Sequence, residues 1–159
     1  INSLKNFEFV DKLELKAALI NKCINLLNNN AEIAKEAMDE AQASANEHGL
    51  PRDRYDSFRA QVLKKRDLFA QQFQKCQNDL LIYQKIDLKS RPEAIGFGSL
   101  VITTKHKILI ATGVGKVVVK DDSYYVISRQ TPLYQKMQGL AVGDSFEFND
   151  GIIKILELF

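Results

Sequence analysis

The stretch that decides the fold is LELKAALINKCINLLNNNAEIAKEAMDEAQASA, residues 13–45. Its apolar residues recur in steps of three and four, and ten consecutive positions of this seam carry an apolar side chain. Such spacing is typical of a helix that packs along a single partner. The seam positions are Leu13, Ala17, Ile20, Ile24, Leu27, Ala31, Ala34, Met38, Ala41 and Ala45.

A second helical pattern follows a turn that is marked by Gly49 and Pro51. When the chain folds back antiparallel at this turn, small residues of the first seam face large residues of the second, and such layers interdigitate well. We therefore predict an antiparallel coiled-coil hairpin over residues 1–92, with its tip at about 45–56. The apolar positions of the second pattern are Tyr55, Phe58, Val62, Phe69, Phe73, Cys76, Leu80, Tyr83 and Ile86.

Beyond residue 92 the apolar period changes from that of a helix to that of a strand. Short β-rich runs alternate with turn residues such as Gly113-Val114-Gly115. One short helix interrupts them, because Pro132 suits a first helical turn and Gly139 suits a helix end. We predict a small, mostly antiparallel sheet with one helix over residues 93–159, and an α+β fold overall. The β-rich runs are SLVIT, KILIAT, KVVVK, YYVIS, SFEF and IIKILEL.

The composition narrows the class of protein. Apolar residues make up 45% of the chain, which is enough for a core, and the net charge of +2 restricts any nucleic-acid contact to a local patch. No apolar run approaches the roughly 18 residues that span a bilayer. The N-terminus lacks the layout of a signal peptide, so we expect a cytoplasmic protein. We interpret Cys23 and Cys76 as packing residues, although the antiparallel register leaves a disulfide between them open.

Carboxylates at the tip are the main chemical candidates. The sequence has no spacing typical of a zinc site, a nucleophilic triad or a P-loop. Glu47, Asp53 and Asp56 lie around the turn, and carboxylates held close together can bind Mg²⁺. Beside an active site that already holds one metal ion, they could retain a second ion and activate a water. Alternatively, they are helix-cap and turn residues whose negative charge favours the helix dipole.

The second helical stretch also carries a basic run. Such a run usually forms a solvated face, but it would also suit RNA phosphates or the acidic wall of a channel. Three of its arginines share one heptad position, and the remaining basic residues lie close to them. The run consists of Arg52, Arg54, Arg59, Lys64, Lys65 and Arg66.

Two C-terminal segments, FGSLV (97–101) and ISRQTPLYQKMQGLAVGDSFEF (127–148), resemble the Gre family of bacterial transcript-cleavage factors. That family carries a Phe-Gly-Ser-x-Val strand, and later Ile-Ser-x-x-Ser-Pro-Leu, a short helix, a Gly and a Val-Gly-Asp turn. Thr131 stands for the family's Ser, and Tyr134 replaces its usual Gly. The compact C-terminal part is also similar to nucleoside-diphosphate-kinase regulators of the same superfamily. The matching residues are Ile127, Ser128, Pro132, Leu133, Gly139, Val142, Gly143 and Asp144.

The resemblance implies an FKBP-like C-terminal domain that docks at the rim of the secondary channel of RNA polymerase, while the coiled coil enters the channel. It makes Pro132, Leu133 and Met137 candidates for the docking contact. Leu133 and Met137 could instead lie in the core, which is the commoner place for such residues. The implied partners are RNA polymerase and the 3′ end of the nascent RNA, with no membrane. We expect a monomer.

For the tip, the resemblance implies that two acidic residues stabilise a second Mg²⁺ while the polymerase cleaves backtracked RNA. Glu47 and Asp53 are the candidates for this metal contact, with Asp56 in support. The chain departs from the family here, because His48 and Pro51 stand where the two acids belong. We expect no stably bound cofactor; only the Mg²⁺ of the polymerase active site would be involved.

Two main hypotheses follow for the function. In one, the chain stimulates the polymerase's own RNA cleavage and has no independent activity; in the other, it occupies the channel without cleavage. A prolyl isomerase would need a concave pocket lined with aromatic residues, and a purely structural coiled-coil protein is the remaining alternative. The aromatic residues available for such a pocket are Phe97, Tyr124, Tyr125 and Tyr134.

Overall fold

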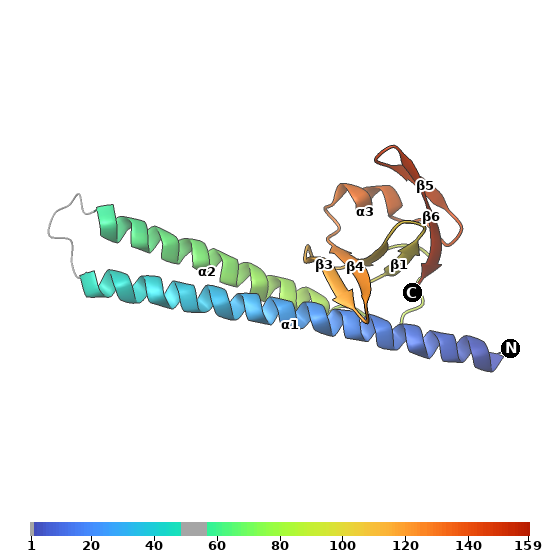
Figure 1. Ribbon diagram of the computed structural model, residues 1–159, viewed down its shortest axis with the longest axis horizontal. Helices are drawn as coiled ribbons and strands as arrows, with labels where there is room; N and C mark the ends of the chain where they lie inside the picture. Colours follow the sequence, from blue (N-terminus) through green and yellow to red (C-terminus); the bar gives the residue numbers. More distant parts are fainter. Residues whose placement is uncertain (1, 49–56) are drawn as a thin grey trace. The chain divides into compact units, whose positions relative to one another are not determined.

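The computed structural model describes the backbone of residues 2–48 and 57–159, and the side chains of residues 10–47 and 57–159. Two long helices precede a β-sheet with one short helix (Figure 1), which confirms the predicted α+β class. No helix in the described part of the chain is both long and apolar enough to cross a bilayer. The helices are α1 (Asn2–His48), α2 (Ser57–Tyr83) and α3 (Pro132–Met137).

All six predicted β-rich runs form strands of one sheet, in the order β3-β4-β2-β1-β6-β5. Neighbouring strands are antiparallel, except for β2 and β4, which run parallel. The sheet is therefore mostly antiparallel, as predicted. The strands are β1 (Leu100–Thr103), β2 (Lys107–Ile110), β3 (Gly115–Val119), β4 (Asp122–Ile127), β5 (Ser145–Phe148) and β6 (Gly151–Leu158).

The chain forms two compact units. The β unit combines Ile1–Cys23 with Ile82–Phe159, and the hairpin unit is Ile24–Leu81. Helix α1 continues through both units, so each unit contains one part of the same helix. The predicted domain boundary between residues 92 and 93 stays a prediction.

In the hairpin unit, α1 and α2 run side by side in opposite directions (Figure 1). Every seam position of α1 is buried or half-buried, so the apolar spacing correctly predicts the covered side of the helix. The prediction is wrong for Phe58, which is 50% exposed. In a pair of helices, each helix covers only one side of the other. Most of the surface of α2 therefore stays accessible to solvent, and Tyr83 is the only buried residue of this helix. Tyr55 of the second pattern lies outside the described residues.

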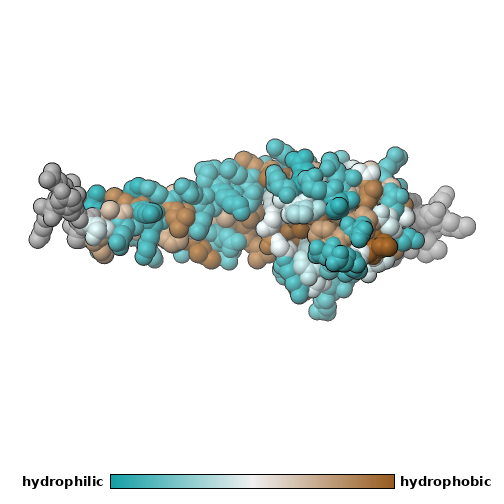
Figure 2. Space-filling model, turned by 90° about the horizontal axis from the view of Figure 1, so that it is seen from above, coloured by the Kyte–Doolittle hydropathy of each residue, from teal (hydrophilic) through white to brown (hydrophobic). Residues whose placement is uncertain are grey.

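The hairpin unit also exposes some apolar side chains away from the seam. Leu26, Ile33, Leu68 and Leu81 are between 37% and 57% exposed. In the space-filling view, brown apolar residues accordingly show between the teal hydrophilic ones along the helices (Figure 2). Scattered exposed apolar residues of this kind are normal for protein surfaces.

The core of the β unit lies on one face of the sheet, beneath α3. Side chains that point to the same face of neighbouring strands meet the apolar side of this short helix, and their burial provides the main stabilisation of the unit. The buried members of the cluster are Ile95, Val101, Ile108, Ile110, Tyr134, Met137, Phe146, Ile153 and Ile155.

The opposite face of the sheet is also buried, which explains why the run in β2 is continuously apolar rather than alternating. Leu100 and Leu109, which pair across β1 and β2, are both fully buried and lie on this face. At the end of α2, the Tyr83 hydroxyl is 2.7 Å from that of Thr112 in a buried hydrogen bond. The first part of α1 reaches the C-terminal strand through an ion pair of 2.7 Å between the Lys12 ammonium and a carboxylate of β6.

Both cysteines are free thiols. Cys23 is fully buried, and this burial raises the pKa of its thiol despite a hydrogen bond with Tyr83, which acts in the opposite direction. A thiol with a raised pKa is a poor nucleophile, because the thiolate is the reactive form. The interpretation of Cys23 as a packing residue fits this environment.

One charged residue of the β unit is buried. Lys16 on α1 is only 2% exposed, one turn before the apolar Leu19 and Ile20. Burial lowers the pKa of its ammonium group, while the negative charge of Asp87 acts in the opposite direction. The folded protein therefore retains this charge at an energetic cost, since water solvates an ammonium better than a protein interior does.

We predict that Lys16→Met stabilises the protein on the order of 1 kcal/mol at neutral pH, since a flexible apolar side chain fits the same space without a buried charge. The folded-state pKa of Lys16 lies below the value of about 10.4 for an unfolded chain. Between these two values the unfolded state binds more protons, so this group makes the wild type more stable as the pH rises. The stability difference, measured by urea unfolding, should therefore shrink as the pH rises from neutral toward the pKa of the unfolded chain. A wild type that is more stable than Lys16→Met at pH 7 would contradict this expectation.

Candidate functional site

The predicted carboxylate site at the tip is only partly within the described residues. Glu47 lies in the last turn of α1 and is exposed. Asp53 and Asp56, together with Arg52 and Arg54 of the basic run, lie outside the described residues. Among the residues that the structure describes, no group of three or more His, Cys, Asp or Glu side chains could hold a metal ion. The site stays a prediction.

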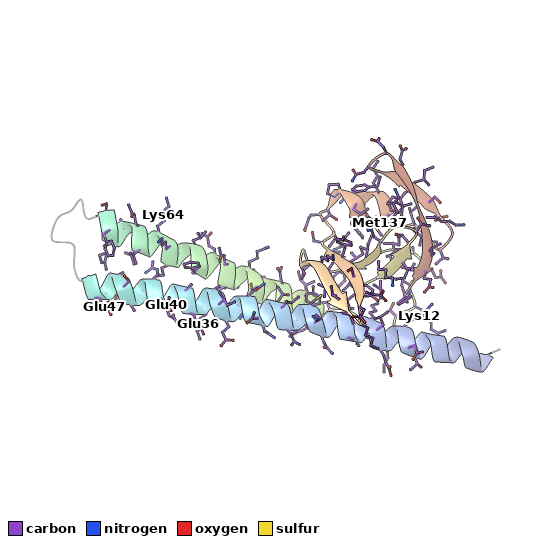
Figure 3. All side chains as sticks on the ribbon, in the orientation of Figure 1. Lys12, Glu36, Glu40, Glu47, Lys64 and Met137 are labelled. Carbon is purple, nitrogen blue, oxygen red and sulfur yellow. The ribbon has the colours of Figure 1, made fainter. Side chains whose placement is uncertain are left out.

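Glu47 ends a row of carboxylates along the outer side of α1. Glu32, Glu36 and Glu40 follow one another at intervals of one helical turn, and Glu47 lies two turns further on. All four are exposed, and the last three are labelled on the side of α1 that faces away from α2 (Figure 3). Like charges one turn apart destabilise a helix slightly. This row was not among the predicted site residues, although its four-residue spacing is visible in the sequence.

Two residues of the predicted basic run lie exposed on the outer surface of α2. Lys64 and Lys65 are exposed, and Lys64 points away from α1 (Figure 3). Together with Gln61, Asp67, Leu68 and Gln71 they line an open groove of about 520 Å³. The groove therefore combines two ammonium groups with one carboxylate and the apolar surface of Leu68, and its net charge is positive, which suits an anionic ligand.

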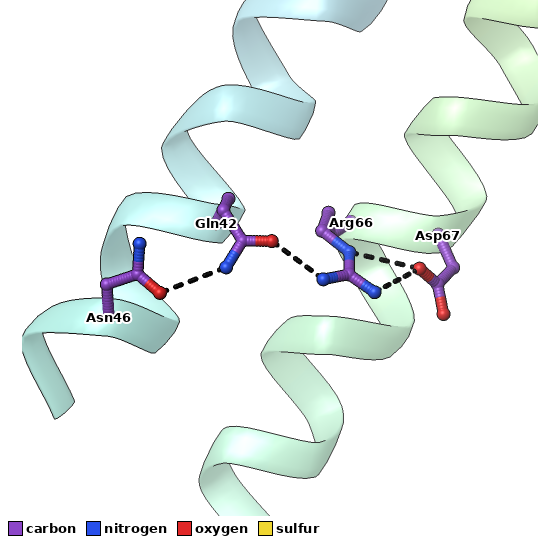
Figure 4. A network of polar contacts seen from close by, with 4 residues as sticks. All are labelled: Gln42, Asn46, Arg66 and Asp67. Atoms are coloured by element: carbon purple, nitrogen blue, oxygen red, sulfur yellow. Dashed lines mark hydrogen bonds and ion pairs between the residues drawn. The ribbon is translucent and has the colours of Figure 1, made fainter. Parts of the chain in front are cut away.

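Arg66 of the same run has a different environment. Its guanidinium donates a hydrogen bond of 2.7 Å to Gln42 of α1 and two bonds, of 2.7 and 3.0 Å, to the neighbouring Asp67 (Figure 4). The Gln42 amide in turn donates to Asn46 at 3.0 Å. Arg66 therefore links the two helices of the hairpin, and Arg59 is half-buried, so the structure separates both arginines from the exposed lysines.

The two helices of the hairpin unit carry opposite charge. Residues 24–47 of α1 contain five acidic residues and one basic residue, whereas α2 contains five basic and two acidic residues. Since Glu36 and Lys64 point to opposite sides (Figure 3), the unit has an acidic flank on α1 and a basic flank on α2. Two flanks of opposite charge give the hairpin unit a preferred orientation beside a charged partner, with the basic flank toward negative charge.

The predicted docking residues on α3 occupy three different environments. Pro132 is exposed, Leu133 is partly buried against the core, and Met137 is fully buried within it (Figure 3). The sequence leaves two roles open for Met137, and the structure places this residue in the core. The prediction that Met137 is a docking contact is therefore wrong, because its side chain is not accessible to a partner. Tyr134, which departs from the family's Gly, is also a core residue at 4% exposure.

The residues that carry the family signature build the turns around α3. The Thr131 hydroxyl caps the helix, because it accepts a hydrogen bond from a backbone N–H of the first turn at 3.3 Å. Gly139 and Gly143 have φ angles of +78° and +93°, which residues with a Cβ atom rarely adopt. The Asp144 carboxylate accepts a bond of 2.9 Å from the Ala141 N–H. The signature is thus explained by local structure.

No known family model matches the chain, and no curated protein sequence matches it. Several solved structures do. The transcription factor Gfh1 is 19% identical, with coverage of 85% of this chain and 92% of that one and a TM-score of 0.34. GreA factor homolog 1 (Gfh1) of Thermus thermophilus is 17% identical, with coverage of 86% and 94% and a TM-score of 0.33. Gfh1 of Thermus aquaticus is 17% identical, with coverage of 84% and 92% and a TM-score of 0.32.

The hydrogen bonds of Arg66 predict a stabilising role for this residue. We expect Arg66→Met to destabilise the hairpin unit by about 0.5 to 1.5 kcal/mol, because the Gln42 amide oxygen loses its partner and the half-exposed pair with Asp67 contributes little. The matched variant Lys64→Met, at an exposed position on the same helix, should change stability by less than about 0.5 kcal/mol. Thermal unfolding followed by circular dichroism at 222 nm measures both. Equal effects of the two variants would show that the bond to Gln42 does not stabilise the hairpin.

Proposed function

We propose that this chain is a transcription factor that binds RNA polymerase and inserts its hairpin unit into the secondary channel. The observation that carries the proposal is the Gre-type signature of residues 127–148, which belongs to a chain that also has a long helical hairpin. Helix α2 has 27 residues and is therefore about 40 Å long, while each helix is only about 10 Å wide. A pair of such helices has the dimensions of a probe for a narrow channel.

The charges of the hairpin unit support insertion beside a nucleic acid. Lys64 and Lys65 on the basic flank would contact RNA phosphates. The carboxylate row on α1 would be repelled by the same phosphates, so the two flanks together would fix the rotation of the hairpin about its long axis. This orientation would bring the lysine groove, rather than the glutamates, to the RNA.

Stimulation of RNA cleavage is the first candidate activity. Glu47 is exposed near the tip and has no hydrogen-bond or ion-pair partner in the described part of the chain, so its carboxylate oxygens can bind a metal ion without first losing one of those residues. Asp53 and Asp56 are assigned to the same contact from the sequence alone. A Mg²⁺ ion of the polymerase would supply the activation of the attacking water. The carboxylates of this chain would only retain and orient that ion, and the polymerase would carry out the cleavage.

Occupancy of the channel without cleavage is the second candidate. It is favoured by the departure from the family motif, since His48 and Pro51 stand at the positions of the two acids. In this case the chain would compete with cleavage factors for the channel and would hold the polymerase in one state. Binding to the polymerase is common to both candidates.

An RNA cleavage assay on backtracked elongation complexes tests the first candidate. We expect the wild type to release short 3′ fragments, and Glu47→Ala to slow this release by roughly tenfold or more, as for the loss of one charge-stabilising group. Glu36→Ala is the matched control, because Glu36 is an exposed glutamate of the same row, three turns from Glu47. Release that is equally fast with both variants would exclude Glu47 from the metal contact. Absence of cleavage together with inhibition of a Gre factor would select the second candidate.

Charge reversal on α2 tests the binding itself. We expect the double variant Lys64→Glu/Lys65→Glu to weaken the affinity for elongation complexes by tenfold or more and to flatten its dependence on salt, because phosphate contacts are lost. Lys75→Glu is the control, as Lys75 is another exposed lysine of α2, outside the groove. Fluorescence anisotropy of labelled protein at several salt concentrations gives both quantities. Equal losses for the double variant and the control would mean that the net charge of the helix, and not the groove, determines binding.

A further inference from the structure

A small cavity of about 130 Å³ lies within the β unit, between α1 and the segments that connect α2 with β1. Its lining is rich in hydrogen-bond donors and holds one more positive than negative charge. Two ammonium groups, two hydroxyls and one carboxylate line it, and these belong to Lys16, Lys85, Ser90, Ser99 and Asp87.

Lys16 is the central group of this cavity. It is 2% exposed, and among the described residues its ammonium has no hydrogen-bond acceptor and no carboxylate at ion-pair distance. Asp87 acts on it only through its charge, while one oxygen of the Asp87 carboxylate accepts a bond of 2.9 Å from the Lys89 N–H. The ammonium opens onto the cavity rather than being sealed off from it, and a charged residue that is buried to this extent calls for a physical explanation. Since an apolar residue would be more stable here, a ligand that pairs with the ammonium provides one.

The other lining groups complete a donor set around Lys16. The Ser99 hydroxyl is buried and accepts a bond of 3.1 Å from the Gly96 N–H, so its own hydrogen can be donated to a ligand. Lys85 and Ser90 are exposed and place further donors at the mouth of the cavity. The ring of Phe97 forms one wall, and the Arg129 guanidinium lies over this ring at 5.2 Å from its centroid. Arg129 thus adds positive charge near the cavity.

We propose that this cavity binds a phosphate-type oxyanion, either as the free ion or as the phosphoryl group of a larger molecule, with Lys16 and Ser99 as inner ligands and Lys85 at the mouth. At about 30 Å³ per water molecule, the space holds about four waters, which is close to the size of one phosphate group. A nucleoside does not fit inside it. The charge of Asp87 favours the protonated form of Lys16, which is the form that pairs with an anion.

Isothermal titration calorimetry of the full chain with sodium phosphate at pH 7 tests the proposal, with sodium chloride at matched ionic strength as the reference titration. We expect phosphate to bind the wild type, and Lys16→Met to bind it roughly tenfold more weakly or not at all, since a charge-assisted hydrogen bond is lost. Lys85→Met, at an exposed position, should weaken binding by a smaller factor. Lys22→Met, at an exposed position of α1 outside the cavity, should bind as the wild type does.

A second titration with adenosine 5′-monophosphate distinguishes the sources of the oxyanion. Equal affinity for phosphate and the ester assigns the site to the free ion, and tighter binding of the ester assigns it to a larger molecule; both support the proposal. An absence of binding to the wild type would overturn it. Undiminished phosphate binding to both Lys16→Met and Lys85→Met would also overturn it, because the anion would then bind elsewhere. Circular dichroism of each variant confirms that it is folded.

Discussion

Helix α1 depends on burial of its apolar seam, and both units depend on α1. Isolated helices are only marginally stable in water, so the 47 residues of α1 require partners that cover the seam. In the hairpin unit the partner is α2, and Ala31, Ala34 and Ala45 are buried. In the β unit the seam residue Ile20 and its neighbours Leu19 and Cys23 are buried. Alanine occupies four of the seven seam positions between residues 24 and 45, where two helices must approach closely.

Because the seam provides the stability of the hairpin, its outer surfaces are available for charge. The carboxylate row of α1 carries like charges one turn apart, and Lys64 and Lys65 lie exposed on α2. Neither arrangement stabilises the helices themselves, whereas the bonds of Arg66 to Gln42 and Asp67 do. Lys16 in the β unit is a further group that lowers stability where it lies. Such groups are expected where function, rather than folding, determines the residue.

The sequence predicted elements well where a single local rule decides the outcome. Apolar spacing predicted the covered side of α1, and Pro132 and Gly139 correctly marked α3. Outcomes that depend on residues distant in the sequence were either not predicted or, for Phe58, predicted wrongly. The parallel pairing of β2 with β4 depends on the order of strands in the sheet. The exposure of Phe58 depends on how much of α2 is covered. The burial of Lys16 follows from segments more than 65 positions away in the sequence.

The two possible places of Met137 could be separated only by the three-dimensional packing. For the candidate site, the sequence identified the basic run but could not separate Arg66 from the exposed lysines.

In the proposed function, the hairpin unit enters the secondary channel beside the nascent RNA. Photo-crosslinking tests it most directly, with a benzophenone-bearing residue at position 64 in the groove, or at position 118 on the exposed side of β3 as a reference. The protein is added to backtracked elongation complexes whose RNA is labelled at the 3′ end. We expect labelled crosslinks from position 64 and none from position 118. Crosslinks from position 118 alone, or from neither position in complexes that bind the protein, would contradict insertion of the hairpin.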